Sequence, residues 1–287
     1  MLKIQKILFP VDFSASCDAM GPFVKRAATM LAAKVTLLHV LEPSAAGFEP
    51  LARPVPDIEE DRKKCACDRL KSYLSSEFPV RKTPRLLALG EAAAQISRIA
   101  RERAFELIVM PTHAGVFRRM LLGSTTAKVL NDADSLVLTT QHAETISPRG
   151  LEHREWVCTI GLGADSGRVL RCASALAETV RANLTIIHAI PAAERGLPVQ
   201  FDLEERVESM QKRAARKRID ELQRALGSHA RVLIAVGPVK DALAQAACRL
   251  HADVLIMGRS SRPDAQGRLR DLVYAMVRDA PCPVLSV

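Results

Sequence analysis

Aromatic residues are scarce in this sequence, since Phe, Tyr and Trp together make up 4% of its 287 residues. Surfaces that bind nucleic acid stack bases on such side chains, and no basic stretch here is interleaved with Phe or Tyr. No apolar run approaches the roughly 18 residues that a membrane-spanning helix requires. The opening MLKIQKILFPVDFS also lacks the continuous apolar core of a signal peptide. We therefore expect a cytoplasmic protein without a nucleic-acid or membrane partner.

Cysteines are few, odd in number and scattered, with seven in the chain. Most stand among apolar residues, which is typical of reduced, buried thiols rather than of a disulfide framework. Cys65 and Cys67 suggest a metal or redox pair, but they lie in DIEEDRKKCACDRLKSYL, which has a helical pattern. Positions i and i+2 of a helix face different directions. We interpret these cysteines as structural or incidental and expect no metal site.

Basic residues outnumber acidic ones by 41 to 32, which gives a net charge of +9. Such a balance permits an anionic partner. The densest basic cluster, Lys212 to Arg218, shares a helical pattern with acidic residues on either side of it. This pattern is typical of a solvated helix face, which is the interpretation we favour.

An internal repeat organises the chain. VTLLHVLEP aligns with LTIIHAIPA, which pairs His39 with His188, and ALGEAAAQISRIARERAFELIVMP aligns with AVGPVKDALAQAACRLHADVLIMG, which pairs Gly90 with Gly237. The polar segment QHAETISPRGLEH separates the two copies. A chain that is 48% apolar can form a core in each copy. We therefore expect two domains of one kind, at residues 1–142 and 154–287.

Each copy alternates short apolar runs with longer helical patterns. The first copy predicts strands at Ile4–Val11, Lys34–Leu41, Arg85–Leu89, Glu106–Met110 and Leu136–Thr139, and helices near residues 17–32, 57–77, 91–104 and 124–132. Continuous apolar runs such as LIVM and TLLHV indicate burial on both faces. Each half is thus predicted to be a doubly wound α/β unit, a parallel sheet with helices on both faces. Ligands of such sheets bind beyond the carboxyl ends of the strands, where the strand order reverses.

The residues at those strand ends resemble the universal stress protein family. ILFPVDFS, LLHV, LIVMPTHA, RRMLLGS and AKVL carry the resemblance in the first half, and RDAPCPVLSV closes the second as family members close. The resemblance covers nearly the whole chain twice, as a tandem form. It implies an open five-stranded parallel sheet in each half, in strand order 3-2-1-4-5. It also implies that the halves pair through their last strands as an intramolecular pseudo-dimer, and it leaves a further homodimer open.

Many members of this family bind ATP, and others bind no nucleotide. The binding group is marked by an aspartate at the end of the first strand and by G-x2-G-x9-G-[S/T] after the fourth. A carboxylate there can accept a hydrogen bond from the exocyclic amine of adenine. Glycines let the backbone approach phosphates, and a Gly-Ser that opens a helix presents N–H groups and a hydroxyl to anionic oxygens.

The first half keeps part of this pattern, with Asp12 at the adenine position and Gly123-Ser124 at its end. Pro111 and Ala114 replace the two leading glycines, eight residues rather than nine separate Ala114 from Gly123, and proline offers no N–H. The resemblance thus implies ATP, with Mg²⁺ beside it, and at most slow hydrolysis without an assigned catalytic residue. The expected nucleotide contacts are Pro10, Asp12, Val40, Met110, Pro111, Ala114, Gly123, Ser124 and Thr125.

The second half keeps less of the pattern. Gly161 stands at the aspartate position, Ala189 replaces Val40, and Arg270-Asp271 stand in place of Gly-Ser, although Gly258 keeps the first glycine. We expect this half to be a structural pseudo-partner rather than a second ATP site.

Two functions stay open at this point. One is a regulatory stress-response protein with an adenine nucleotide in its first half, and the other is a scaffold without nucleotide that binds an unknown protein partner. Asp12 could equally cap the helix that begins near Ser14, and Ser124 could be an ordinary N-cap. His39 and His188 are interpreted as hydrogen-bonded core histidines, and His113 as a residue that orients the loop after the fourth strand.

Overall fold

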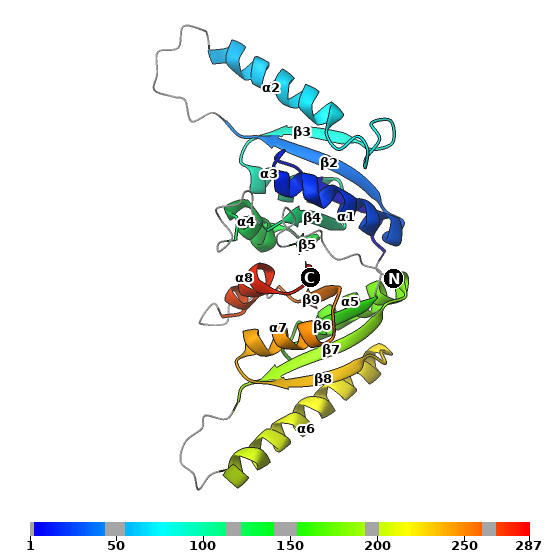
Figure 1. Ribbon diagram of the computed structural model, residues 1–287, viewed down its shortest axis with the longest axis vertical. Coiled ribbons are helices and arrows are strands. Elements are labelled where there is room, and N and C mark those ends of the chain that lie inside the picture. The colour runs from blue at the N-terminus through cyan, green and yellow to red at the C-terminus, as the bar shows by residue number, and fades with distance from the viewer. Residues whose placement is uncertain (1–2, 44–54, 113–121, 141–153, 193–200, 260–267) are drawn as a thin grey trace. The chain divides into compact units, whose positions relative to one another are not determined.

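The computed structural model describes residues 3–43, 55–112, 122–140, 154–192, 201–259 and 268–287 (Figure 1). The chain divides into two compact units, one over Lys3–Pro148 and the other mainly over Arg149–Val287. None of the described helices is long and apolar enough to cross a membrane.

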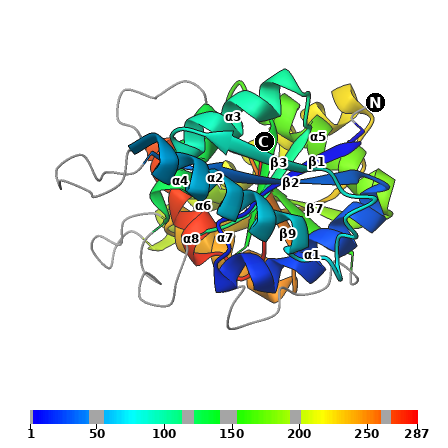
Figure 2. The same ribbon diagram turned by 90° about the horizontal axis from the view of Figure 1, so that it is seen from above.

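The first unit is a parallel sheet with the strand order β3-β2-β1-β4-β5. In chain order its elements are β1 (Lys6–Pro10), α1 (Ala15–Leu31), β2 (Lys34–Leu41), α2 (Val55–Ser72), β3 (Arg85–Leu89), α3 (Ala92–Glu102), β4 (Leu107–Pro111), α4 (Ser124–Asp132) and β5 (Leu136–Thr140). Because crossover connections are right-handed, the reversal after β3 places α1 and α2 on one face and α3 and α4 on the other. Seen from above, α1 and α3 lie on opposite sides of β1 and β2 (Figure 2).

The second unit repeats this topology, with the strand order β8-β7-β6-β9-β10 and parallel pairing throughout. Its elements are β6 (Glu155–Thr159), α5 (Ser166–Val180), β7 (Asn183–Ile190), α6 (Phe201–Leu226), β8 (Arg231–Val236), α7 (Val239–Arg249), β9 (Val254–Met257), α8 (Arg268–Asp279) and β10 (Val284–Ser286). The predicted doubly wound α/β fold is confirmed in both halves. Pairing of the halves through their last strands stays a prediction.

The core of the first unit lies where the sequence is apolar on both faces of a strand. Ile7, Leu8 and Phe9 of β1 are fully buried, as is Ile108 of β4. Side chains of successive strand residues point to opposite faces, so both faces of these central strands are covered by helices. The continuous apolar runs that predicted a parallel sheet therefore reflect burial on two sides.

Helix α2 ends earlier than its sequence pattern predicts, at Ser72 rather than near residue 77. Leu74 adopts a φ of 48°, in the left-handed region that a helix does not continue through. The segment after α2 is held by Arg85 at the start of β3. The Arg85 guanidinium donates to four main-chain carbonyls, those of Leu70, Tyr73, Phe78 and Thr83, at 2.8 to 3.1 Å.

All seven cysteines are free thiols. Cys17, Cys158, Cys172 and Cys282 are buried, whereas Cys65 and Cys248 are exposed. Cys65 and Cys67 both lie on α2, as the sequence pattern predicts. Among the described residues, no group of three or more His, Cys, Asp or Glu side chains could hold a metal ion.

Candidate functional site

The turn that follows β1 is fixed by contacts from two other elements. Val11 N–H donates to Leu38 O at 2.8 Å, and the His39 Nδ1 lies 2.8 Å from Val11 O. Because a carbonyl only accepts, Nδ1 carries a proton and donates. Phe13 has a φ of 62°, and its ring lies against the His39 ring with centroids 4.3 Å apart. The Arg69 guanidinium, from α2, lies 4.5 Å from the Phe13 ring centroid.

Asp12 is exposed and does not cap α1. The cap is Ser14, whose Oγ accepts from Cys17 N–H at 3.3 Å, while Asp12 Oδ1 accepts from Ser14 N–H at 2.9 Å. The capping alternative for Asp12 is therefore wrong, because its carboxylate fixes the turn one step before the helix. A carboxylate offers about four acceptor positions, so Asp12 keeps acceptor capacity for a ligand.

A cavity of about 200 Å³ opens at the carboxyl ends of β1 and β4, which are neighbours in the sheet where the order reverses. Eight of the nine predicted contact residues line it, and the ninth, Ala114, lies outside the described residues. The set of expected contacts missed several other lining residues, some of which stand inside the quoted motifs ILFPVDFS and LLHV: Val11, Cys17, Leu38, His39, Ala92, Ile96 and Thr126. His113 also lies outside the described residues.

The first turn of α4 forms one wall of this cavity. Gly123 is the N-cap and has no side chain to satisfy the helix, so Ser124 is the first helical residue rather than the cap. The first N–H groups of a helix have no acceptor within it, and here they belong to residues that line the cavity. Gly123 N–H itself donates to Thr112 O at 2.8 Å, and Thr126 Oγ1 donates to Pro111 O at 3.0 Å. These two bonds attach the helix start to the end of β4.

Cys17 contributes a neutral surface to the cavity. Burial raises the pKa of its thiol well above the ordinary range, and the negative charge of Asp12 adds to the effect. The thiolate is the reactive form of cysteine, so this side chain acts as an apolar lining group rather than as a nucleophile.

The same turn recurs after β6 in the second unit. His188 Nδ1 lies 2.8 Å from Ile160 O, Leu162 has a φ of 58°, and Arg218 donates to Leu162 O at 2.9 Å. Arg69 correspondingly donates to Phe13 O at 3.4 Å. The prediction that His39 and His188 are hydrogen-bonded is confirmed, although both are half-buried rather than fully buried. Both histidines therefore support the fold.

The chemistry of the site is not repeated. Gly161 stands where Asp12 stands in the first unit, and a Cβ added to it would meet nothing within 4 Å. The second unit thus has no carboxylate at this position, although there is space for a side chain. Arg270 and Asp271 lie inside α8, which begins at Arg268. Gly258, the retained motif glycine, has a packing role, because an added Cβ would lie 2.7 Å from Val169 Cγ2.

This contact makes a prediction about Gly258. Gly258→Ala is expected to lower the free energy of unfolding by about 1–3 kcal/mol, the usual cost of overpacking a filled interior. Val169→Ala should recover most of that loss when the two changes are combined, because it removes the opposing methyl group. The matched control is Gly161→Ala, which adds the same methyl group to open space. Urea denaturation measures all four proteins, and a Gly258→Ala protein as stable as the control would contradict the packing role.

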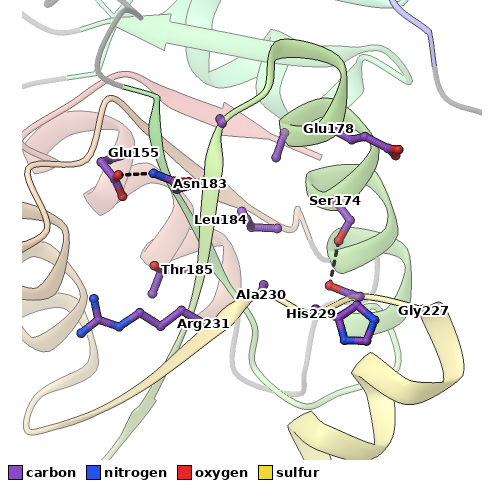
Figure 3. A pocket seen from close by; sticks show the side chains of 13 residues that line it. Glu155, Ser174, Glu178, Asn183, Leu184, Thr185, Gly227, His229, Ala230 and Arg231 are labelled. Atoms are coloured by element: carbon purple, nitrogen blue, oxygen red, sulfur yellow. Dashed lines mark hydrogen bonds between the residues drawn. The ribbon is translucent and has the colours of Figure 1, made fainter.

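A second cavity, of about 710 Å³, lies at the amino ends of β6, β7 and β8 (Figure 3). Polar side chains in it already satisfy one another. Asn183 Nδ2 donates to Glu155 Oε1 at 2.6 Å, and the Ser174 and Ser228 hydroxyls lie 3.2 Å apart. This second cavity is larger than the first. However, it lies at the amino ends of the strands, whereas ligands of this fold class usually bind at the carboxyl ends. The cavity after β1 and β4 is therefore the candidate site.

Comparison with known proteins identifies a matching family, a relative and two similar solved structures. The model of the Universal stress protein family matches residues 3–141 and 157–287. A universal stress protein of Methanocaldococcus jannaschii is 26% identical over 150 residues, which cover 47% of this chain and 93% of that protein. A universal stress protein of Archaeoglobus fulgidus has a TM-score of 0.68 at 16% identity, over 99% of this chain and 96% of its own. A functionally unknown protein of Pseudomonas aeruginosa has a TM-score of 0.64, also at 16% identity, over 99% and 92%.

Proposed function

Because the chain belongs to the universal stress protein family, with two of its domains in tandem, we propose that it is a stress-response regulatory protein that binds one adenine nucleotide, ATP, in its first half. The observation that carries the proposal is that a hydrogen-bond acceptor and a set of hydrogen-bond donors line the same cavity. Asp12 supplies an anionic acceptor on one side, and the first turn of α4 supplies N–H donors on the other.

These groups suit the two ends of the nucleotide. The exocyclic amine of adenine is a donor that a carboxylate can accept, and Val40 and Met110 give the base apolar neighbours. Phosphate oxygens are acceptors, which the N-terminus of a helix attracts through its N–H groups and dipole. The cavity is smaller than the roughly 300–1,000 Å³ of sites that enclose a whole ligand of this class. The base end would be enclosed, with the phosphates at the start of α4.

Only the first half is assigned a nucleotide. Gly161 offers no carboxylate to the base, and Arg270 and Asp271 stand within α8 rather than before it. Mg²⁺ enters the proposal only with the phosphates, since it is commonly held by substrate phosphates and water with one or two carboxylates. The pairing of the halves through their last strands, and a further homodimer, belong to the same proposal as features of the family.

The test is to purify the protein, denature it and measure the released small molecules by chromatography. We expect adenine nucleotide at a substantial fraction of one per chain, and a rise in Tm when ATP is added to nucleotide-free protein. Asp12→Asn should abolish both effects, because its Oδ1 is kept by Ser14 N–H and its NH2 then offers a donor, not an acceptor, to the amine of the base. The matched control is Asp165→Asn, which makes the same change to a carboxylate that follows the first strand of the other half.

A nucleotide-free extract together with an unchanged Tm would contradict the proposal and favour the scaffold function. Two observations favour that second function. Pro111 has no N–H to offer a phosphate, and the N–H of Gly123 is already bound to Thr112 O. Two nucleotides per chain would instead show that the second half is a site and not a pseudo-partner.

A further inference from the structure

A cationic groove runs along the second unit, between α6 and β8. Its volume is about 590 Å³, and five of its seven lining residues are basic. The lining residues are Lys212, Arg213, Arg216, Lys217, Asp220, Arg224 and Ile234. Figure 1 shows α6 lying alongside β8, the last strand in the order of its sheet. The groove therefore combines one flank of a helix with the free edge of a sheet.

The cations of the groove are only partly neutralised. Lys212 pairs with Glu208 at 2.6 Å, and Arg216 pairs with Asp220 at 3.2 Å. Arg213, Lys217 and Arg224 form no ion pair with any residue in the described part of the chain. The interpretation of this cluster as a solvated helix face thus holds for the paired residues. The three unpaired cations are also exposed, as that interpretation predicts, and they share one groove with the edge of the sheet.

The edge of β8 offers main-chain hydrogen bonds beside these cations. Gly237 N–H donates to Ile190 O of β7 at 3.0 Å. Alternate residues of a strand direct their main-chain groups to the same side, so Val232, Ile234 and Val236 direct theirs away from β7. Arg216 covers part of this edge through a 3.4 Å contact with Val232 O. The side chains from Val232 to Val236 are all half-exposed, as expected for an edge strand that has a neighbouring strand, β7, on one side only.

The helix flank and the strand edge match in length and in spacing. The first and last cationic residues, Lys212 and Arg224, lie twelve residues apart on α6, which is about 18 Å at 1.5 Å per residue. The six residues of β8 extend about 20 Å. Residues four apart on a helix recur every ~6 Å, and side chains on one face of an extended segment recur every ~6.6 Å. An extended segment with an acidic residue at every second position would therefore keep in register with α6.

We propose that the groove between α6 and β8 docks an extended acidic segment of a partner protein, which adds to the sheet beside β8 and places alternate carboxylates against α6. Strand addition of this kind takes its affinity from main-chain hydrogen bonds and its specificity from alternate side chains. Carboxylates fit the cations, and arginine binds them with paired hydrogen bonds. Single-stranded nucleic acid fits less well, because the described residues that line the groove include no aromatic side chain for bases to stack on.

The first half does not offer the same surface. Counting from Arg69, which corresponds to Arg218, Lys64, Asp68 and Ser75 take the places of the three unpaired cations. One cation is kept, one becomes an acid and one becomes neutral. The half that lacks the nucleotide pattern is thus the half that carries the cationic groove, and the two halves have different binding surfaces.

The experiment measures binding of a fluorescein-labelled peptide, Glu-Thr-Glu-Val-Glu-Thr-Glu with blocked ends, to the full chain by fluorescence anisotropy at low salt. We expect saturable binding that the double variant Arg213→Glu and Lys217→Glu weakens at least about tenfold, since like charges would then face each other. Lys25→Glu with Lys34→Glu is the matched control, because it changes the net charge equally at exposed positions of the first unit. This control should stay within about twofold of the unchanged protein.

Two methylated peptides separate strand addition from simple charge attraction. One carries N-methyl groups on its Glu nitrogens and the other on its Thr and Val nitrogens. Only one of these two sets can face β8, so one peptide should lose binding at least about tenfold while the other stays near the parent. Equal behaviour of the two peptides would overturn strand addition. Equal binding by the groove variant and its control, or tighter binding of a single-stranded RNA of equal charge, would overturn the acidic protein segment as the occupant.

Discussion

Arg85→Met is expected to lower the free energy of unfolding by about 3 kcal/mol. The Arg85 guanidinium donates to the carbonyls of Leu70, Tyr73, Phe78 and Thr83, and so ties the end of α2 and the turn after it to β3. Hydrogen bonds to a charged group contribute about 1.5–3 kcal/mol each, but water can replace some of them at a half-buried site. The expected loss is therefore well below the sum of four bonds.

Urea denaturation of the full chain measures this change. Arg85→Lys should recover only a minor part of the loss, because a compact ammonium cannot reach four carbonyls as a planar guanidinium does. The matched control is Arg98→Met, which removes an exposed arginine from its pair with Glu102 on α3 and should cost no more than about 0.5 kcal/mol. A loss below about 1 kcal/mol for Arg85→Met would show that water replaces the guanidinium at all four carbonyls.

Phe9→Ala is expected to cost about 3–5 kcal/mol, the usual range for removing a large aromatic side chain from a filled core. Phe9 is 0% exposed on the central strand β1 and meets Phe78 edge to face, with ring centroids 6.2 Å apart. It also directly precedes Pro10, which lines the candidate site. The candidate site and the core of the first unit thus share one strand.

The measurement is again the free energy of unfolding. Unfolding is followed by far-UV circular dichroism rather than by tryptophan fluorescence, because Trp156 lies in the other half. Phe9→Leu keeps most of the volume and should cost less than about half as much. Val80→Ala is the control, since Val80 is 53% exposed and its truncation should change stability little. Equal costs for Phe9→Ala and Phe9→Leu would indicate that the core relaxes around the cavity.

Local patterns in the sequence were sufficient to predict the bounds of two strands. β2 and the edge strand β3 begin and end at the predicted residues, because each is a short apolar run with polar or turn residues at its ends. The start of α4 at Ser124 was also predicted, since the Gly-Ser pair is a local signal. The residues of the candidate site were expected from the family resemblance, and they stay a prediction as ligand contacts. Those that the structure describes lie at the ends of β1 and β4, on β2 or at the start of α4.

Features that depend on distant contacts could not be predicted. The early end of α2 involves Arg85, which follows it by more than ten residues and contacts it from the start of β3. The cap of α1 is Ser14 rather than Asp12, a choice between neighbours that depends on side-chain geometry. The groove beside α6 needs the edge position of β8, which no pattern within α6 reports. The helical pattern could therefore predict that these cations lie on a solvated face, but not that a strand edge lies beside them.

The braced turn after the first strand of each unit has a consequence for how the two halves could diverge. Phe13 and Leu162 both hold a left-handed backbone that costs a residue other than glycine on the order of 1–3 kcal/mol. In each half a histidine and an arginine from other elements hold that backbone in place. These two braces recur although the neighbouring residue differs, with Asp12 adding its own hydrogen bond in one half and Gly161 having no side chain in the other. The carboxylate at this position can therefore be lost in one copy of the repeat while the histidine and arginine keep the left-handed turn in both copies.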